Sequence, residues 1–194
     1  MIRLATPEDG AAIARIYNQN VTEGSFANCD LTRGTAEERA TRLAASEPRF
    51  PTFVHEGPGG AVVGWASLKR FSARPYYADV AEIAVYVDSA HRARLVGAAL
   101  MLHLLGAACA HDFRTLIAII LEKNKASIRG ALAAGFEPLA TLHQAAYLRG
   151  QWVDILWLAR DLTSDADSIA ELYASRFEST PTTSSKSYSG DSLT

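Results

Sequence analysis

The sequence predicts one α/β domain in which strands and helices alternate along the chain. Two observations lead to this expectation. Segments rich in β-branched and aromatic residues alternate with segments whose apolar residues recur about every three to four positions, as in amphipathic helices. A length of 194 residues with 48% hydrophobic content is enough to bury one full core and leaves little room for a second domain.

The N-terminal part predicts a strand at residues 2–5 and then two helices. Thr6 can cap the first helix, and apolar residues follow it at helical spacing. The second helix is predicted over residues 35–46. Thr35 is its cap, and Glu38 three positions later completes a capping box.

The middle of the chain predicts a hairpin and a further strand. Strands at 52–56 and 62–68 flank the sequence Gly-Pro-Gly-Gly at 57–60, which is a turn signal. Residues 69–79 are rich in Arg and Tyr and predict an irregular segment. A strand at 81–87 follows, because its residues are almost all apolar.

The second half of the domain alternates helices and strands. The nearly all-apolar, β-branched stretch after the long helix predicts a strand buried on both faces. The elements predicted here are a helix from Leu95 to about His111, a strand at 116–121, a helix at 125–134 that Gly135 ends, and closing strands at 136–142 and 152–158.

These elements make up a predicted domain of residues 1–162. Residues 163–178 predict a C-terminal helix, because part of this segment is amphipathic. The last segment, 179–194, is dominated by Ser and Thr with almost no large apolar residue, so we expect it to be disordered.

Composition excludes several classes of function. A formal net charge of −2 offers no domain-wide basic excess for binding nucleic acid. No apolar run is long enough to span a bilayer and no signal segment opens the chain, so the cytoplasm is the expected compartment. Cys29 and Cys109 form no CxxC pair and the five histidines form no HxxxH pair, so we expect free thiols and no metal site.

The segment Glu82–Leu105 carries the strongest functional signal. It predicts a buried strand at 83–87, a turn with two arginines, and a helix that begins near Leu95. Amide groups at a helix N-terminus have no intrahelical partner, and the helix dipole adds partial positive charge there. The segment therefore predicts an anion site, with a pyrophosphate as the expected occupant. The alternative is that the two arginines are solvated charges on a surface turn.

This segment resembles motif A of the GNAT superfamily of acyl-CoA-dependent N-acyltransferases, in the branch of phosphinothricin and methionine sulfoximine acetyltransferases. That family's loop has the pattern Arg/Gln-x-x-Gly-x-Gly/Ala, and residues 92–97 read RARLVG. Gly97 matches the second glycine, whereas Leu95 stands at the first. The resemblance implies the GNAT fold, a mixed and mostly antiparallel central sheet flanked by helices, with acetyl-CoA as cosubstrate.

The resemblance also implies which residues hold acetyl-CoA. In the family, the strand before the loop splays from its neighbour, and its free backbone groups bind the pantetheine arm and the thioester. Without the resemblance, the same side chains fit an ordinary core strand. The implied cofactor-binding residues are Val85, Tyr86 and Val87 on the strand, Ala93, Arg94, Leu95, Val96, Gly97 and Ala98 in the loop, and Asn124 and Ser127 in a downstream Asn-x-x-Ser motif.

The region after Asn124 matches the family only in part. Asn124 also follows an apolar strand, so it can cap the next helix whatever else it does. Gly135 and Phe136 match a Gly-Phe pair of the family, but Ala131 falls where relatives place a His or Tyr, a proposed general acid for the departing thiolate. Alanine cannot donate a proton, so we expect a slower reaction rather than none.

Glu82 is the predicted catalytic residue. It is an acid at the head of an otherwise apolar strand, which suits a general base that acts directly or through water. Relatives carry a Glu at the matching place, in a Val-Glu-x-x-Val-Tyr-Val pattern. The structural alternative is a Glu at the strand end that points into solvent.

The resemblance implies three residues on the substrate side. Arg74 and Tyr77 match an Arg and a Tyr before the base strand, and Phe26 matches an aromatic residue in the first long loop. A guanidinium can bind a carboxylate or phosphinate through two hydrogen bonds. The structural alternatives are a surface charge for Arg74 and a core anchor for Phe26.

Together these features predict an N-acetyltransferase that moves acetyl from acetyl-CoA to the amino group of a small amino acid or analogue. The alternative is a degenerate, non-catalytic GNAT-fold protein that binds a small ligand or a protein partner, in view of Leu95 and Ala131. A third, weaker hypothesis is an acylase of proteins or peptides. Relatives are often homodimers, so a homodimer is an expectation by analogy.

Overall fold

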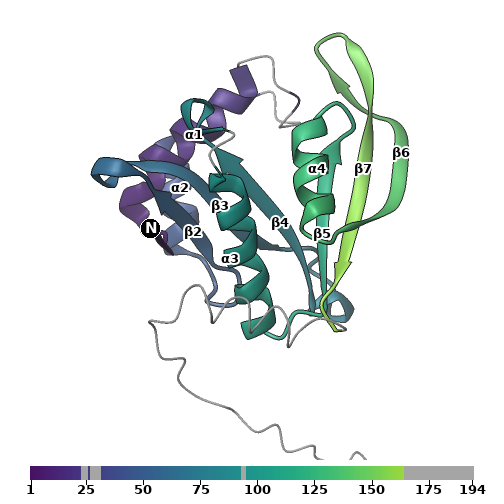
Figure 1. The fold of residues 1–194 in the computed structure, drawn as a ribbon, viewed down its shortest axis with the longest axis horizontal. Coiled ribbons are helices and arrows are strands. Elements are labelled where there is room, and N and C mark those ends of the chain that lie inside the picture. The colour runs from purple at the N-terminus through teal and green to yellow at the C-terminus, as the bar shows by residue number, and fades with distance from the viewer. Residues whose placement is uncertain (23–25, 27–31, 93–94, 164–194) are drawn as a thin grey trace, which may run out of the picture.

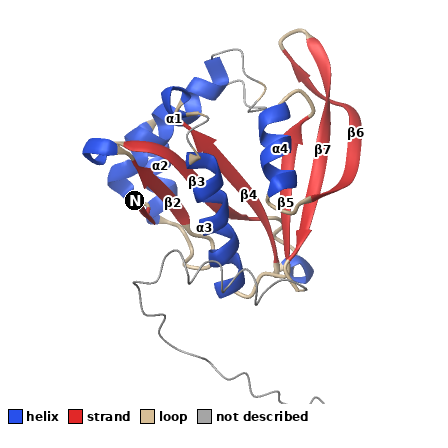
Figure 2. Cartoon of the chain, viewed as in Figure 1, coloured by secondary structure: helices blue, strands red, loops and turns tan. Residues whose placement is uncertain are grey.

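The protein forms one central sheet of seven strands with helices on both faces, as a computed structural model describes it (Figures 1 and 2). The structure describes residues 1–22, 26, 32–92 and 95–163. The predicted α/β class is therefore confirmed, with strands and helices in the expected order along the chain.

The bounds of the elements are as follows. The strands are β1 (Ile2–Leu4), β2 (Thr52–Glu56), β3 (Val62–Arg70), β4 (Val80–Val87), β5 (Thr115–Leu121), β6 (Glu137–Leu148) and β7 (Gln151–Asp161). The helices are α1 (Gly10–Thr22), α2 (Ala36–Ala44), α3 (Val96–Ala110) and α4 (Lys125–Ala133). Short 3-10 turns lie at Pro7–Asp9, Pro58–Gly60, Pro75–Tyr77 and Ser89–His91.

The sheet is mostly antiparallel and has one parallel pair in the described part of the chain. Its strand order is β1-β2-β3-β4-β5-β7-β6, and β4 and β5 are the parallel neighbours. The helices α3 and α4 cover one face, and α1 and α2 cover the other (Figure 1). The mixed, mostly antiparallel sheet that the resemblance implies is confirmed.

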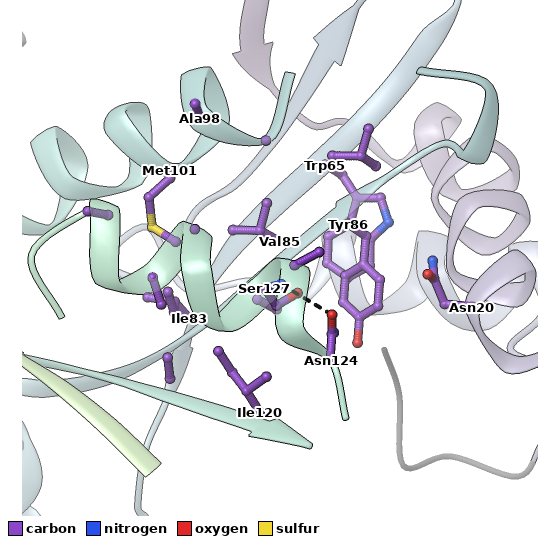
Figure 3. A pocket seen from close by; sticks show the side chains of 18 of the residues that line it. Asn20, Trp65, Ile83, Val85, Tyr86, Ala98, Met101, Ile120, Asn124 and Ser127 are labelled. Carbon is purple, nitrogen blue, oxygen red and sulfur yellow. Dashed lines mark hydrogen bonds between the residues drawn. The ribbon is translucent and has the colours of Figure 1, made fainter. Parts of the chain in front are cut away.

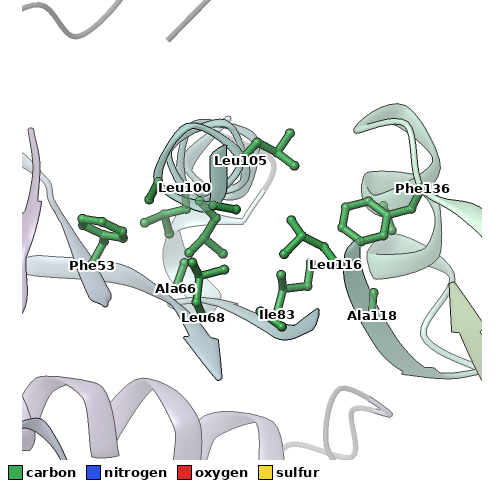
Figure 4. Packing of buried hydrophobic residues seen from close by; sticks show 14 of the residues in the cluster. Phe53, Ala66, Leu68, Ile83, Leu100, Leu105, Leu116, Ala118 and Phe136 are labelled. Atoms are coloured by element: carbon green, nitrogen blue, oxygen red, sulfur yellow. The ribbon is translucent and has the colours of Figure 1, made fainter. Parts of the chain in front are cut away.

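The larger core lies between the sheet and α3 (Figure 4). Leu100 and Leu104 of α3 are fully buried, and they pack in one cluster with Leu116 of β5. At Gly64 the helix and the sheet come especially close. A Cβ atom there would lie 2.9 Å from Val96 Cγ1 and 3.0 Å from Leu100 Cδ1. The absence of a side chain at this position thus lets the first turn of α3 rest on β3.

Local signals explain where the helices begin and end. The Thr35 hydroxyl accepts a hydrogen bond from the Glu38 amide (3.1 Å), and the Glu38 carboxylate accepts one from the Thr35 amide (2.9 Å). The predicted capping box of α2 is therefore confirmed. Asn124 Oδ1 accepts from the Ser127 amide (3.2 Å) at the start of α4. Gly135, with a φ of +79°, ends α4 in the left-handed conformation.

Three predictions about the strands are corrected. β6 and β7 run well beyond the predicted 136–142 and 152–158, because they pair with each other along a hairpin and pairing overrides weak local signals. β5 is not buried on both faces: Ile119 is exposed, at a point where β5 no longer pairs with β4. In the segment predicted as irregular, 69–79, the first residues extend β3 and a 3-10 turn follows.

Some predictions fall on residues that the structure does not describe. All but the first residue of the predicted C-terminal helix at 163–178, the Ser- and Thr-rich tail at 179–194, and Cys29 are in this group. Cys109 is described and is a free thiol. Within the described ranges, no helix is long and apolar enough to cross a lipid bilayer. No group of three or more His, Cys, Asp or Glu in those ranges could hold a metal ion.

Candidate active site

The strands β4 and β5 separate after a short paired region and leave a gap in the sheet. They pair over three residue pairs, of which Glu82–Ile117 is the last. Beyond this pair, β4 continues to Val87 and β5 continues to Leu121 without ladder pairs between them, whereas β4 stays paired with β3 from Ala81 to Val87. The gap agrees with the splayed strand that the resemblance implies.

The gap presents backbone groups of β4. The Asp88 amide donates to the Val63 carbonyl (2.9 Å), which shows that the Asp88 amide faces β3. Because successive residues of a strand turn their backbone groups to opposite neighbours, the groups of Val85 and Val87 face the gap. A backbone polar group is costly to leave unpaired, so this edge is suited to an extended ligand that carries amides of its own.

A cleft of about 1230 Å³ lies at the gap, and residues from elements on both faces of the sheet line it (Figure 3). This volume is more than enough for an elongated cofactor, since ligand pockets commonly measure about 300–1,000 Å³. Two predicted cofactor-binding residues, Ala93 and Arg94, lie outside the described residues. The predicted site residues that line the cleft are Phe26, Glu82, Val85, Tyr86, Val87, Leu95, Val96, Gly97, Ala98, Asn124 and Ser127.

On the face of α3 and α4, small residues keep the cleft open. Gly97 and Ala98 line it from α3, and Gly130 and Ala131 line it from α4. Ala131 is 1% exposed and also packs in the core, so its methyl group alone occupies the position for which the resemblance implies a His or Tyr. Position 131 therefore offers no proton donor.

The N-terminus of α3 presents amide groups that have no partner within the helix, and a residue in the left-handed conformation precedes it. Leu95 precedes the helix with φ of +62° and ψ of 2°, and its side chain makes no capping hydrogen bond. The first intrahelical bond runs from the Ala99 amide to the Leu95 carbonyl (2.9 Å). The amides of Val96, Gly97 and Ala98 come before it, so they are available to an anion.

Leu95→Gly is expected to raise the free energy of unfolding by about 1 kcal/mol. A non-glycine residue in the left-handed region costs about 1–2 kcal/mol, and glycine removes this cost. Part of the gain is lost, because glycine also gives the unfolded chain more conformational freedom. Little packing is lost, because the Leu95 residue is 80% exposed. Leu95→Ala is the control, since it keeps the Cβ atom. Thermal unfolding measures both variants, and equal gains would contradict the left-handed conformation.

The helix α1 is fastened to the turn that leads into α3. The side chain of Asp88 is 8% exposed. Its carboxylate accepts hydrogen bonds from the Arg15 guanidinium and from Gln19 Nε2 (3.3 Å). In the same turn, the Arg92 guanidinium donates to Asn20 Oδ1 (3.1 Å). These contacts fix the turn on one side of the cleft, and with it the start of α3.

Asp88 gives this turn a characteristic dependence on pH. Burial alone would raise the pKa of Asp88, but hydrogen bonds from Arg15 and from the Ala90 amide outweigh it and lower the pKa to about 2. A carboxyl group with a lowered pKa stabilises the fold above its unfolded value of 3.8, and this stabilisation is lost as the pH falls toward 2.

Asp88→Asn is expected to remove about 1–2 kcal/mol of stability at neutral pH, because the variant keeps the shape but not the charge. The difference between the two proteins should shrink as the pH falls through the window from 3.8 to about 2. Urea unfolding at a series of pH values measures it. A difference that stays constant down to the lowest pH would contradict the role of the charge.

Glu82 lies where β4 and β5 part. Its carboxylate accepts a hydrogen bond from Lys69 Nζ on β3 (2.9 Å), and its side chain is 28% exposed. Tyr86 lies four positions further on β4, so it points to the same face of the sheet. There its ring stacks on Trp65 with centroids 4.6 Å apart (Figure 3). Glu82 therefore faces the cleft beside a cation and an aromatic wall.

The structure separates the three residues predicted on the substrate side. Phe26 lines the cleft, and Lys123 Nζ lies 5.0 Å from its ring centroid. Arg74 and Tyr77 lie at the turn before β4 and are not among the residues that line the cleft. Tyr77 instead packs edge-on against Phe71, with ring centroids 5.6 Å apart. A substrate role for Arg74 and Tyr77 stays a prediction.

Several residues of the cleft belong to no motif in the sequence. The period of two along β3 is the one usable signal, because it places Trp65 and Lys69 on one face of the strand. No pattern in the sequence indicates which residues of α1 and α2 line the cleft, because this depends on how the two helices pack on the sheet. The residues of the cleft that sequence reasoning missed include Tyr17, Asn20, Arg39, Arg42, Trp65 and Lys69.

Comparisons with known proteins agree with this geometry. The family described as acetyltransferase (GNAT) domain matches residues 2–157. The chain is 34% identical over 160 residues to the phosphinothricin N-acetyltransferase of Streptomyces viridochromogenes. The aligned region covers 82% of this chain and 86% of that protein. It is 30% identical over 165 residues to the L-methionine sulfoximine/L-methionine sulfone acetyltransferase of Salmonella typhimurium. This second aligned region covers 85% of this chain and 96% of that protein.

A solved structure is similar over the same region. The crystal structure of a GNAT superfamily phosphinothricin acetyltransferase from Sinorhizobium meliloti in complex with acetyl-CoA matches with a TM-score of 0.79 and 28% identity. The match covers 83% of this chain and 87% of that chain. The strand order and the gap of this chain therefore occur in a fold that is similar to that of a protein solved with acetyl-CoA.

Proposed function

The chain belongs to the GNAT acetyltransferase family, and on this basis we propose that its acceptor is the amino group of a small amino acid or amino-acid analogue. The protein is an N-acetyltransferase that uses acetyl-CoA as cosubstrate. The proposal for the acceptor is supported by the names of two relatives, which act on phosphinothricin and on methionine sulfoximine or sulfone. The observation that supports acetyl transfer at this site is the gap between β4 and β5, with Glu82 at its closed end.

The residues of the cleft fit acetyl-CoA, which supplies the thioester carbonyl that the amine attacks. The amides of Val96, Gly97 and Ala98 hold the pyrophosphate at the N-terminus of α3. The backbone groups of Val85 and Val87 pair with the amides of the pantetheine arm, in place of a strand. This arrangement belongs to an acyltransferase domain of residues 1–162.

The proposed chemistry uses a base and backbone donors. Glu82 accepts the proton of the acceptor amine, directly or through water, so that the amine has a free electron pair. The amides that face the gap donate to the carbonyl oxygen on which negative charge develops. No side chain at Ala131 protonates the leaving thiolate, and a thiolate leaves without such help because it is a stable anion.

An assay of thiol release tests this function. With millimolar acetyl-CoA and a panel of small amino acids, the purified protein should release free thiol in an acceptor-dependent way. The non-catalytic alternative is distinguished by thermal unfolding with acetyl-CoA. A ligand at a hundred times its Kd stabilises by about 2.7 kcal/mol, so stabilisation without thiol release would favour a binding protein.

A homodimer is the proposed assembly, with the β6–β7 hairpin as its interface. β6 is the last strand of the sheet, and this hairpin exposes several large apolar side chains. Exposed apolar side chains that gather at one edge of a sheet often mark a protein–protein contact, and the Tyr147 and Trp152 rings already lie 5.2 Å apart. Sedimentation should give the mass of two chains, and a monomer at micromolar concentration would contradict the proposal. The exposed residues are Leu139, Leu142, Tyr147 and Trp152.

A further inference from the structure

We propose that Lys69 on β3 binds the carboxylate of the acceptor while Glu82 takes the proton of its amine, so that the pair selects α-amino acids. The inference deepens the proposed function and rests on it, because it takes Glu82 as the residue that meets the amine. It assigns a specificity-determining residue at a position that belongs to no motif in the sequence.

Lys69 and Glu82 are held side by side by the pairing of their strands. The two residues are direct neighbours in the register between β3 and β4. Lys69 Nζ lies 2.9 Å from Glu82 Oε1, and both residues line the cleft. Directly opposed residues of paired strands turn their side chains to the same face of the sheet. A cation therefore lies within one hydrogen bond of the proposed base, at the point where β4 leaves β5.

The ion pair can open to receive a ligand. The Lys69 side chain is 48% exposed and the Glu82 side chain is 28% exposed. An exposed ion pair contributes little to stability, so a ligand that offers both charges can replace it at little cost. A zwitterion meets this condition, because its ammonium group contacts Glu82 and its carboxylate contacts Lys69. Each side chain then exchanges one partner for another of the same charge.

The spacing of the pair suits an α-amino acid. A single carbon atom separates the amine from the carboxylate in such a molecule, so its two charges lie close together, as do those of Lys69 and Glu82. A β- or γ-amino acid sets its charges further apart, and a simple amine brings no anion to Lys69. The geometry therefore favours the α-amino acid over the other two classes of acceptor.

The proton transfer is a second reason for an anion at Lys69. As the acceptor amine loses its proton, an N–H bond breaks and an O–H bond forms on Glu82, which becomes neutral. Lys69 then has no negative partner on Glu82, and a partly desolvated cation is costly to leave unpaired. The carboxylate of an amino acid supplies the missing charge at this step, whereas a simple amine does not.

Three arginines are the rival candidates for binding this carboxylate. Arg39 and Arg42 line the cleft from α2, and Arg74 lies at the turn before β4 and is not among the residues that line the cleft. Lys69, by contrast, is the residue of β3 directly opposite Glu82. An α-amino acid whose amine is at Glu82 therefore has Lys69 within reach of its carboxylate.

Kinetics with three related acceptors test the proposal, each at saturating acetyl-CoA. They are L-methionine sulfone, its carboxamide, and the β-amino acid that has one more carbon atom between amine and carboxylate. The unsubstituted protein should prefer the first in kcat/KM by about 10-fold or more. Lys69→Gln should raise the KM for L-methionine sulfone by about 10- to 100-fold and change the KM for the carboxamide by less than about threefold, as expected for loss of a charge-assisted hydrogen bond. Lys69→Arg keeps the charge, so its KM should lie between.

Arg70→Gln is the matched control. Arg70 is the next residue of β3, it forms an ion pair with Glu47 (2.8 Å), and it is not among the residues that line the cleft. This variant should leave the KM for L-methionine sulfone unchanged. Titration calorimetry of L-methionine sulfone against the CoA-bound protein gives the same comparison without turnover.

The ratio between the amino acid and its carboxamide separates binding from positioning. If Lys69 served to hold Glu82 in place, Lys69→Gln would lower kcat equally for both acceptors, and this result would overturn the proposal. So would an unsubstituted protein that does not prefer the α-amino acid, an effect of Arg70→Gln as large as that of Lys69→Gln, or a larger effect of Arg39→Ala, Arg42→Ala or Arg74→Ala. Failure of the proposed function is a different result, in which the unsubstituted protein releases no thiol with any acceptor although acetyl-CoA still stabilises it.

Discussion

Glu82→Gln is expected to lower kcat for acetyl transfer by about 10²- to 10⁴-fold, which is the usual effect of losing a general base. Glutamine keeps the size of the side chain at the point where β4 leaves β5, but it cannot take the proton of the acceptor amine. The KM for acetyl-CoA should change little, because the backbone groups that face the gap lie further along the strand, at Val85 and Val87. Steady-state kinetics with both substrates varied measures the two effects.

Lys69→Gln separates loss of the carboxylate from loss of the ion pair. Both substitutions remove the ion pair between Lys69 Nζ and the Glu82 carboxylate. This contact stabilises the fold by at most about 1 kcal/mol, since both side chains are partly exposed. The two variants should therefore unfold at similar temperatures, while kcat falls much further in Glu82→Gln. If kcat of Glu82→Gln equals that of the unsubstituted protein at every pH, Glu82 is not the base.

Gly64→Val is expected to cost about 1–3 kcal/mol of stability and to weaken the binding of acetyl-CoA, because it overpacks a close contact. A Cβ atom at this position would lie 2.9 Å from Val96 Cγ1, 3.0 Å from Leu100 Cδ1 and 3.1 Å from the Tyr86 carbonyl oxygen. The added side chain thus pushes the first turn of α3 away from β3 and β4. Thermal unfolding with and without acetyl-CoA measures both losses.

Gly130→Ala is the control for the addition of carbon atoms to a glycine. A Cβ atom there meets nothing within 4 Å. Because Gly130 lies inside α4, alanine should stabilise the helix by up to about 1 kcal/mol. Gly64→Ala adds the same methyl group and should destabilise. An increase in Tm with both alanine variants would contradict the close approach of α3 to the sheet.

Local chemistry in the sequence was sufficient where a short motif decides the backbone. The capping box of Thr35 and Glu38 predicts the start of α2, and the turn at 57–60 predicts the hairpin of β2 and β3, because these signals act within a few residues. At Leu95 the local sequence does not determine the backbone conformation. The structure has the left-handed one, which explains why the family pattern has glycine there.

Other features depend on contacts between distant segments, so no local pattern reveals them. The length of β6 and β7 follows from their mutual pairing, not from their own residues. The exposure of Ile119 follows from the separation of β4 and β5. Arg74 matches a family pattern, yet the fold of its turn leaves it outside the cleft, whereas Arg39 lines the cleft without matching any pattern.

The sequence by itself determined the family, the cosubstrate and the strand that carries Glu82, because a strand, a basic turn and a helix N-terminus are contiguous in the chain. Only the tertiary structure decided which side chains from other elements line the cleft. Residues of α1, α2 and β3 line it together with Glu82, because helices from different parts of the chain pack on one sheet. Such packing depends on many weak contacts at once, which no short motif records.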